Sequence, residues 1–149
     1  MLFKKNITNT VSNKLTIICV TYNAEESIKY TLESIRLQTF REYELLIIDG
    51  GSKDLTLEVI KNYNLRNIRI ISESDRGIYD AMNKGIFNCT TDWFIFMNAG
   101  DTFASNNTLE RLFKCIKPKS LIVYGNTIVK NTNQSIKAPK YLSRFYFYS

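Results

Sequence analysis

The stretch LTIICVTYNAEESIKYTLESIRLQT, Leu15 to Thr39, contains two hydrophobic patterns in direct succession. Its first part, Leu15 to Val20, is an unbroken run rich in β-branched side chains, which is typical of a strand buried on both faces. In the second part, charged residues fill one face of a helix, and the opposite face is marked at helical spacing by Ile28, Thr31, Leu32 and Ile35. The stretch therefore predicts a buried strand followed by an amphipathic helix.

The same pair of patterns recurs along the rest of the chain. Further buried strands are expected in YELLIID at 43–49, IRIIS at 68–72, DWFIFMN at 92–98 and LIVYGN at 121–126. Apolar stripes mark helices between them, at Thr56, Val59, Ile60 and Tyr63, at Ile78, Ala81, Met82, Gly85, Ile86 and Cys89, and at Leu109, Leu112, Phe113 and Ile116. Asp54 is placed to cap the second helix, and Pro118 helps to end the last one. The alternation predicts a doubly wound α/β domain, with a mostly parallel sheet covered by helices on both faces.

Length and polarity set the expected organisation of the chain. The 149 residues, 44% of them hydrophobic, are enough for one domain with a core. We expect an N-terminal extension at 1–14, the α/β domain at 15–130 and a further region at 131–149, where the alternation is lost. The tail KYLSRFYFYS is compatible with a hairpin strand or, less simply, with a segment in a membrane interface. Because no window has the length of a membrane span and the N-terminus lacks a signal-peptide core, we expect a soluble or at most peripheral protein.

Residue types narrow the chemistry that the chain can carry out. The formal net charge of +6 comes from basic residues scattered between Lys4 and Arg144, so a solvated surface explains it more simply than nucleic-acid binding does. The absence of histidine excludes His-based metal sites and His-based acid–base catalysis. Cys19, Cys89 and Cys115 lie far apart among apolar neighbours, as expected of reduced core thiols in a cytosolic protein. Chemistry is therefore left to carboxylates, amides, hydroxyls and the backbone.

Polar residues collect where the predicted strands end. In an open α/β sheet, ligands bind outside the carboxyl ends of the strands. The strand ends TYNAEE, DGGSKD, SESDRG and NAGD each bring a carboxylate, an amide or a glycine turn to the same edge. We therefore expect one crevice to be surrounded by Thr21, Asn23, Glu25, Asp49, Asp75 and Asp101.

Each of these residues also has a purely structural explanation. Asn23 could cap the first helix, and Asp101 could begin a turn. Gly50 and Gly51 suit a sharp turn after a strand, but their spacing matches neither the P-loop nor the dinucleotide fingerprint. A P-loop kinase and an ordinary Rossmann dehydrogenase are therefore disfavoured.

Two strand ends nevertheless indicate a ligand. Asp49 ends an apolar run, where a carboxylate needs a partner, and it could accept a hydrogen bond from the ring N–H of a pyrimidine. Asn98 and Asp101 offer hard oxygen atoms of the kind that Mg²⁺ and Mn²⁺ prefer, typically shared with substrate phosphates. Together these residues suggest a site for a metal-bound nucleoside diphosphate.

Three segments of the chain resemble a known family. They are VTYNAEESIKYTLESIRLQTFREYELLIIDGGSKDLT at 20–56, SESDRGIYDAMNKGI at 72–86 and DWFIFMNAGD at 92–101. These segments resemble the amino-terminal half of the family 2 glycosyltransferases with the GT-A fold, most of all bacterial enzymes that build O-antigen and capsular polysaccharide. The resemblance covers about 15–126. It implies binding of a nucleotide-sugar donor, usually a UDP-sugar, and transfer of the sugar with inversion to a glycan or lipid-linked acceptor at the inner face of a membrane.

The resemblance also implies roles for individual residues. In the family, the segment matching Thr21, Tyr22 and Asn23 lines the nucleoside pocket, with Glu25 beside it, and the aspartate matching Asp49 contacts the base. The segment DRGIYDAMNKG lies along the donor, with Asp75, Gly77 and Asp80 as its contacts, although its apolar residues also form a packing face.

The stretch FMNAGD matches the family's metal signature, which is commonly an aspartate, a small residue and two more aspartates. In this sequence Asn98 replaces the first aspartate and Gly100 the second. The resemblance therefore implies Asp101 as the main ligand of Mn²⁺ or Mg²⁺ and Asn98 as a weaker, neutral contact.

The family's catalytic base lies in the carboxyl-terminal half, together with most acceptor contacts. Residues 131–149 contain no Asp or Glu, so we assign no catalytic residue and interpret this region as the start of a truncated acceptor-side part. The alternative is a non-catalytic module that binds a nucleotide without transferring a sugar.

Overall fold

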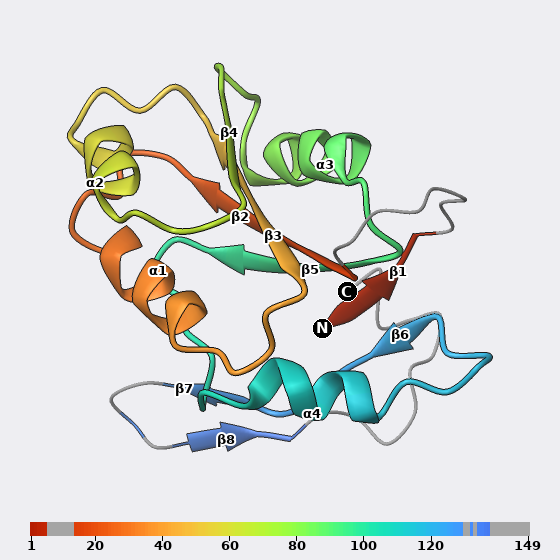
Figure 1. The fold of residues 1–149 in the computed structure, drawn as a ribbon. Helices are drawn as coiled ribbons and strands as arrows, with labels where there is room; N and C mark the ends of the chain where they lie inside the picture. The colour runs from red at the N-terminus through yellow and green to blue at the C-terminus, as the bar shows by residue number, and fades with distance from the viewer. Residues whose placement is uncertain (6–13, 130–131, 133, 138–149) are drawn as a thin grey trace.

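The computed structural model describes residues 1–5, 14–129, 132 and 134–137, and the aromatic tail lies outside them. Its main feature is a six-stranded sheet in the order β4-β3-β2-β5-β1-β6 (Figure 1). The strands are β1 Leu2–Lys4, β2 Leu15–Thr21, β3 Tyr43–Asp49, β4 Ile68–Ser72, β5 Trp93–Asn98 and β6 Ile122–Val123. Strands β4, β3, β2 and β5 pair in parallel, and β1 runs antiparallel to both of its neighbours. The predicted mostly parallel sheet is confirmed.

The strand order reverses at the centre of the sheet. The chain adds β3 and β4 on one side of β2 and then places β5 on the other side. The register pairs Val20 with Asn98, Thr21 with Asp49, and Asp49 with Ser72, so these strands end level with one another. The carboxyl ends of β2 and β5 therefore form the switch point at which open α/β sheets bind ligands.

Helices cover both faces of this sheet. Helices α1 Ile28–Arg36, α2 Thr56–Asn62 and α4 Thr108–Lys114 contribute to one core, and α3 Ile78–Asn88 contributes to the other (Figure 1). Alternate residues of β2 supply the two cores, with Ile17 and Cys19 on the α1 face and Ile18 and Val20 on the α3 face. The strand needs apolar residues throughout because both of its faces are covered.

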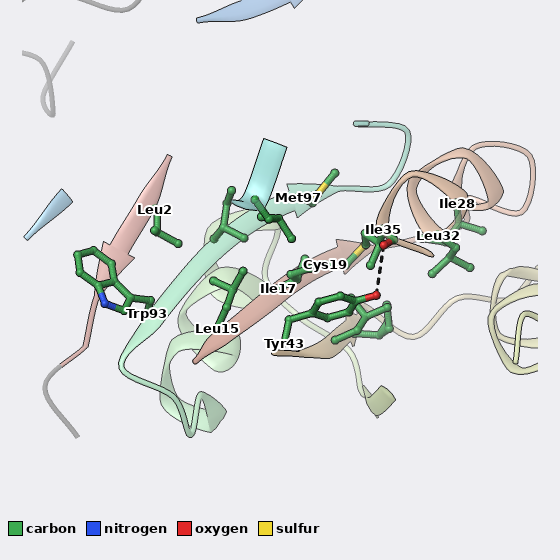
Figure 2. Close-up of a cluster of buried hydrophobic side chains, with 14 of the residues drawn as sticks. Leu2, Leu15, Ile17, Cys19, Ile28, Leu32, Ile35, Tyr43, Trp93 and Met97 are labelled. Atoms are coloured by element: carbon green, nitrogen blue, oxygen red, sulfur yellow. Dashed lines mark hydrogen bonds between the residues drawn. The ribbon is translucent and has the colours of Figure 1, made fainter. Parts of the chain in front are cut away.

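The core on the α1 face contains the side chains predicted to point inward. Ile28, Leu32 and Ile35 are fully buried in one cluster with residues of β2 and β3, and Figure 2 shows Ile35 next to Cys19, with Leu32 and Ile28 farther along α1. Burial of each such side chain stabilises the fold by about 1.5–3 kcal/mol. The Tyr43 hydroxyl donates to the Ile35 carbonyl at 3.2 Å, which ties the end of α1 to the start of β3.

The core on the α3 face depends on one glycine. A Cβ atom at Gly85 would lie 2.3 Å from Cγ2 of Ile18, so the backbone of α3 lies directly on β2. Ala81 is buried as predicted, but Ile78 is 46% exposed and does not belong to the packing face. Ile78 is the first residue of the helix, and burial begins only with Ala81, one turn later.

Some elements differ from the predictions. Leu2–Lys4, expected in an extension ahead of the domain, forms β1, and Leu2 is fully buried between β5 and β6. Of the predicted strand LIVYGN only two residues form β6, and the chain continues into a separate hairpin of β7 Thr127–Val129 and β8 Gln134–Ile136.

Two predicted side-chain environments also need correction. Cys19 and Cys89 are buried thiols, but Cys115 is exposed because it follows the last turn of α4 instead of lying on its inner face. Leu55, not Asp54, occupies the N-cap position of α2, although the Asp54 carboxylate accepts a hydrogen bond from the Thr56 N–H at 3.0 Å. Within the described part of the chain, no helix combines the length and apolarity needed to cross a membrane.

Candidate functional site

Asp49 ends β3, and its carboxylate is turned inward. It is fully buried and accepts four hydrogen bonds. The N–H groups of Gly51 and Ser52 donate at 3.2 and 3.0 Å, and the hydroxyls of Ser52 and Ser72 donate as well. Asp49 therefore holds the glycine turn after β3 against the end of β4. This arrangement leaves the carboxylate no exposed surface, so the expected direct contact with a base is not open here.

The loop after β2 is joined to the loop after β3 by hydrogen bonds. Asn23 has a left-handed backbone, with a φ of 45°, and its side-chain oxygen accepts from the Lys53 N–H at 2.9 Å. The Asn23 N–H donates to the Ser52 hydroxyl, and the Glu25 carboxylate accepts from the Leu55 N–H at 2.8 Å. Asn23 does not cap α1, whose N-cap is Ser27. Asn23 and Glu25 thus build the wall of the site by fixing one strand-end loop to the next.

Gly50 lies between two side chains with exposed surface. A Cβ atom at Gly50 would be 2.6 Å from Oδ2 of Asp75 and 3.3 Å from the ring of Tyr22. The Tyr22 side chain is 59% exposed, and Asp75 is half-buried. Only a glycine allows the two side chains to approach the β3 end so closely. An aromatic ring and a carboxylate are therefore presented together at the carboxyl edge of the sheet.

The turn before α3 is organised by its own acidic residues. The Asp75 carboxylate accepts from the Gly77 N–H at 2.9 Å, and Asp80 accepts from the Arg76 N–H at 3.1 Å. Gly77 has a φ of 114°, a backbone conformation that favours glycine. Lys84 contacts Asp80 at 3.7 Å, so the Asp80 carboxylate already has a cationic neighbour.

The NAGD turn closes the site on the β5 side. The Asp101 carboxylate accepts from the Asn98 N–H at 3.1 Å, and the Asp101 N–H donates to the Asn98 carbonyl at 2.9 Å. Gly100 has a φ of 102°, which explains the small residue at this position. Asp101 is exposed, whereas the side-chain oxygen of Asn98 is buried and has no hydrogen-bond partner among the described residues.

Asp101 has an electrostatic effect on the strand beneath it. Burial, together with the negative charge of Asp101, raises the pKa of the Cys19 thiol to about 12. The Asp101 carboxylate is therefore close enough to the end of β2 to disfavour a second negative charge there.

The residues around this turn suit a particular kind of cation site. No cluster of three or more acidic or cysteine residues that could hold a metal occurs in the part of the chain that the structure describes. One exposed carboxylate and one neutral amide oxygen instead fit an ion that takes most of its ligands from substrate phosphates and water, as Mg²⁺ does. The unpartnered oxygen of Asn98 is compatible with this donor set, since a buried acceptor without a donor is costly.

An open pocket of about 830 Å³ borders the NAGD turn. Its lining includes Asp101 of the turn, Phe103 of the loop before α4, Leu112 of α4 and Ile128 of β7. Asp101 is the one predicted site residue that lines it. Asp101 therefore borders this pocket and also follows the carboxyl end of β5.

The structure brings most of the predicted residues to the carboxyl edge of the sheet, but some of them are exposed there and others are buried. Tyr22, Asp75 and Asp101 present exposed or half-exposed groups, whereas Thr21 is 6% exposed and Asp49 is fully buried. The Thr21 hydroxyl has no hydrogen-bond partner among the described residues.

Sequence reasoning missed the hydroxyl groups that hold the turns, which belong to Thr31, Ser52 and Ser72. Ser52 and Ser72 are small polar residues beside a predicted strand end, which is a usable signal. Thr31 gave no such signal, because it occupies a position in the apolar stripe of the predicted helix.

Comparison with known proteins finds a curated glycosyltransferase of similar sequence. The chain is 38% identical over 123 residues to the PGL/p-HBAD biosynthesis glycosyltransferase of Mycobacterium bovis, a match that covers 78% of this chain and 48% of the relative. The chain thus spans about half the length of this curated relative.

Solved structures share the fold. TarS 1–349 of S. aureus in complex with UDP-GlcNAc matches with a TM-score of 0.64 and 25% identity, over 68% of this chain and 30% of that chain. The mannosyltransferase PcManGT of Pyrobaculum calidifontis, in complex with GDP-Man and Mn²⁺, matches with a TM-score of 0.62 and 22% identity, over 70% and 32%. The model of the family described as "Glycosyl transferase family 2" matches residues 16–149. With its mostly parallel GT-A-like sheet, the chain belongs to glycosyltransferase family 2.

Proposed function

We propose that the chain binds a nucleotide-sugar donor, with UDP as the nucleotide, at the carboxyl edge of its sheet. We further propose that the protein transfers the sugar, with inversion, to a glycan or lipid-linked acceptor of a bacterial cell-surface polysaccharide such as O-antigen or capsule. The observation that carries the proposal is the approach of Tyr22 and Asp75 to Gly50, beside the switch point that ends in Asp101. The likeness to TarS, which is in complex with UDP-GlcNAc, supports it.

In this proposal the exposed groups contact the donor and the buried groups hold them in place. The ring of Tyr22 offers an aromatic face to the nucleoside, and the Asp75 carboxylate is an acceptor for N–H or hydroxyl groups. Asp49 serves the site through the turn that it holds, while Asn23 and Glu25 fix the wall. Thr21, Gly77 and Asp80 complete the donor contacts expected from the family resemblance.

Negative charge develops on the departing diphosphate during glycosyl transfer. Asp101 would hold a Mn²⁺ or Mg²⁺ ion there as its main protein ligand, with Asn98 as a neutral contact. When bound, the ion supplies electrostatic stabilisation of the leaving group. Lys53 and Arg76 are exposed on the turns after β3 and β4 and add positive charge near the same edge.

Deprotonation of the acceptor hydroxyl requires a base, which we assign to a part of the protein other than the described residues. We propose that the acceptor is met on the inner face of a membrane, with the domain in the cytoplasm and attached peripherally, because a lipid-linked acceptor is held there. A non-catalytic module that binds the nucleotide without transfer is the second candidate. It differs from the enzyme in predicting nucleotide binding without turnover.

Calorimetric titration with UDP and with GDP, each with and without Mn²⁺, tests donor binding. We expect saturable binding of UDP that Mn²⁺ strengthens. No heat with either nucleotide, in a sample shown to be folded by circular dichroism, contradicts the proposal. Transfer or hydrolysis of UDP-sugars by the same sample distinguishes the enzyme from the module, which binds but does not turn over.

A further inference from the structure

We infer that Thr31 of α1 is a positioning residue for the turn that carries Asp101. Its side chain is fully buried, and its hydroxyl meets several backbone groups of the same turn. The hydroxyl donates to the Asp101 carbonyl at 2.8 Å and accepts from the Gly100 N–H at 2.9 Å. The Asn98 carbonyl lies 3.4 Å away as a weaker acceptor.

This use of a helical threonine is unusual. A threonine hydroxyl in a helix commonly bonds to a carbonyl of the preceding turn of its own helix. The Thr31 hydroxyl instead serves the loop after β5, which is far away in sequence. A valine at this position would fill the same volume but would leave the Gly100 N–H and the Asp101 carbonyl without their partner.

Thr31 begins a polar stripe that continues along α1. Ser34 lies one turn later and accepts from the Phe103 N–H at 3.4 Å. Gln38 follows α1, is fully buried, donates to the Ser105 carbonyl at 2.8 Å and accepts from the Leu109 N–H at 3.1 Å. The stripe attaches the segment between β5 and α4 to α1 at successive points, and Thr31 is the point next to Asp101.

The position of the Asp101 carboxylate depends on this attachment. Gly100 has a left-handed φ of 102°, so the turn is held in a conformation that a free chain seldom keeps. Thr31 fixes the groups on either side of the Gly100–Asp101 peptide, which sets the direction of the carboxylate. This role rests on the proposed function, because a fixed direction matters most if Asp101 holds a cation against a diphosphate.

The test compares Thr31→Val with Thr31→Ser, which keeps the hydroxyl, in the full 149-residue chain. The first measurement is the ratio of UDP affinities with and without Mn²⁺, by calorimetry. We expect Thr31→Val to reduce this ratio about tenfold, the size of the loss of one or two hydrogen bonds, and Thr31→Ser to retain it within about twofold. An unchanged ratio in folded Thr31→Val overturns the inference.

Thr16→Val is the matched control. Thr16 is also fully buried, and its hydroxyl bonds to Glu44 at 2.7 Å and Thr91 at 2.8 Å, near the amino end of β2 and on the opposite face of the sheet from α1. Thr16→Val should lower the unfolding midpoint to a similar extent without changing the Mn²⁺ ratio. If Thr16→Val lowered the ratio of UDP affinities with and without Mn²⁺ as much as Thr31→Val does, the effect of Thr31 would be explained by loss of overall stability. That result would overturn its positioning role.

A second measurement separates this inference from the proposed function. Amide hydrogen exchange of Gly100, followed by NMR without nucleotide or metal, should be at least about tenfold faster in Thr31→Val than in Thr31→Ser. If wild type does not bind UDP, the proposed function fails, yet faster exchange still supports the positioning of the turn. Equal exchange in the two variants contradicts the positioning role whatever the outcome of the titration.

Discussion

Replacing Asp49 tests whether its buried carboxylate holds the turn after β3, at the proposed donor site. Two of its four hydrogen bonds come from backbone N–H groups, those of Gly51 and Ser52, which cannot turn away. Asp49→Ala leaves both without an acceptor, at a cost of about 1–2 kcal/mol each for half-buried groups, so we expect a loss of about 3 kcal/mol in the free energy of unfolding. The serine hydroxyls can rotate to other acceptors and add little.

Asp49→Asn should be much milder. The carbonyl oxygen of the asparagine side chain can still accept from the backbone N–H groups of Gly51 and Ser52, and its amide can donate to the Ser52 hydroxyl. The variant therefore loses mainly the extra strength that the carboxylate charge gives these hydrogen bonds, about 1 kcal/mol of the free energy of unfolding. Urea unfolding followed by far-UV circular dichroism at pH 7 measures both losses. Asp92→Ala, an exposed aspartate at the other end of the sheet, is the control and should change stability by less than about 0.5 kcal/mol. An alanine variant no less stable than the asparagine variant would refute the reasoning.

Two other sites give direct predictions. Gly85→Ala should destabilise the protein by about 1–2 kcal/mol, because its Cβ would meet Ile18 at 2.3 Å and overpacking outweighs the gain of about 1 kcal/mol in helix propensity. Gly125→Ala, with no atom within 4 Å of the added Cβ, is its control in the same urea assay, and equal stability of the two variants would argue against close packing of α3 on β2. Iodoacetamide at pH 8 should modify the exposed Cys115 before the buried Cys19, because the pKa of the Cys19 thiol is raised to about 12. Mass spectrometry follows the labelling of each cysteine. Equally fast labelling of Cys19 would disprove its burial.

Much of the fold was predictable because its signals are local. The apolar run from Leu15 to Val20 requires a strand covered on both faces, and the spacing of Ile28, Leu32 and Ile35 requires a helix that packs on it. Leu2–Lys4 carried no such signal, because three residues are too few to show a pattern and the strand depends on pairing with β5 and β6. Cys115 was misplaced because a cysteine among apolar neighbours can lie just beyond the helical face that is buried.

The candidate site was predictable as a location but not as a set of contacts. Strand ends converge in any parallel sheet, so the position of Asp75 and Asp101 at one edge followed from the order of the elements. The inward turn of Asp49 depends on N–H groups of a particular loop conformation, which the residue types alone do not specify. Thr31 was counted as a packing residue because its spacing is that of the inward face, and only the structure shows what its hydroxyl meets.

The effect of Mn²⁺ on UDP binding, compared between wild type and Asp101→Asn, tests the central claim most directly. The asparagine keeps an oxygen that can accept from the Asn98 N–H, so the turn is retained while the carboxylate charge is removed. We expect Mn²⁺ to strengthen UDP binding by wild type and to have no measurable effect on the variant, with metal-free UDP binding alike in both. Unchanged manganese dependence in Asp101→Asn would contradict the assignment of Asp101 as the metal ligand of the donor site.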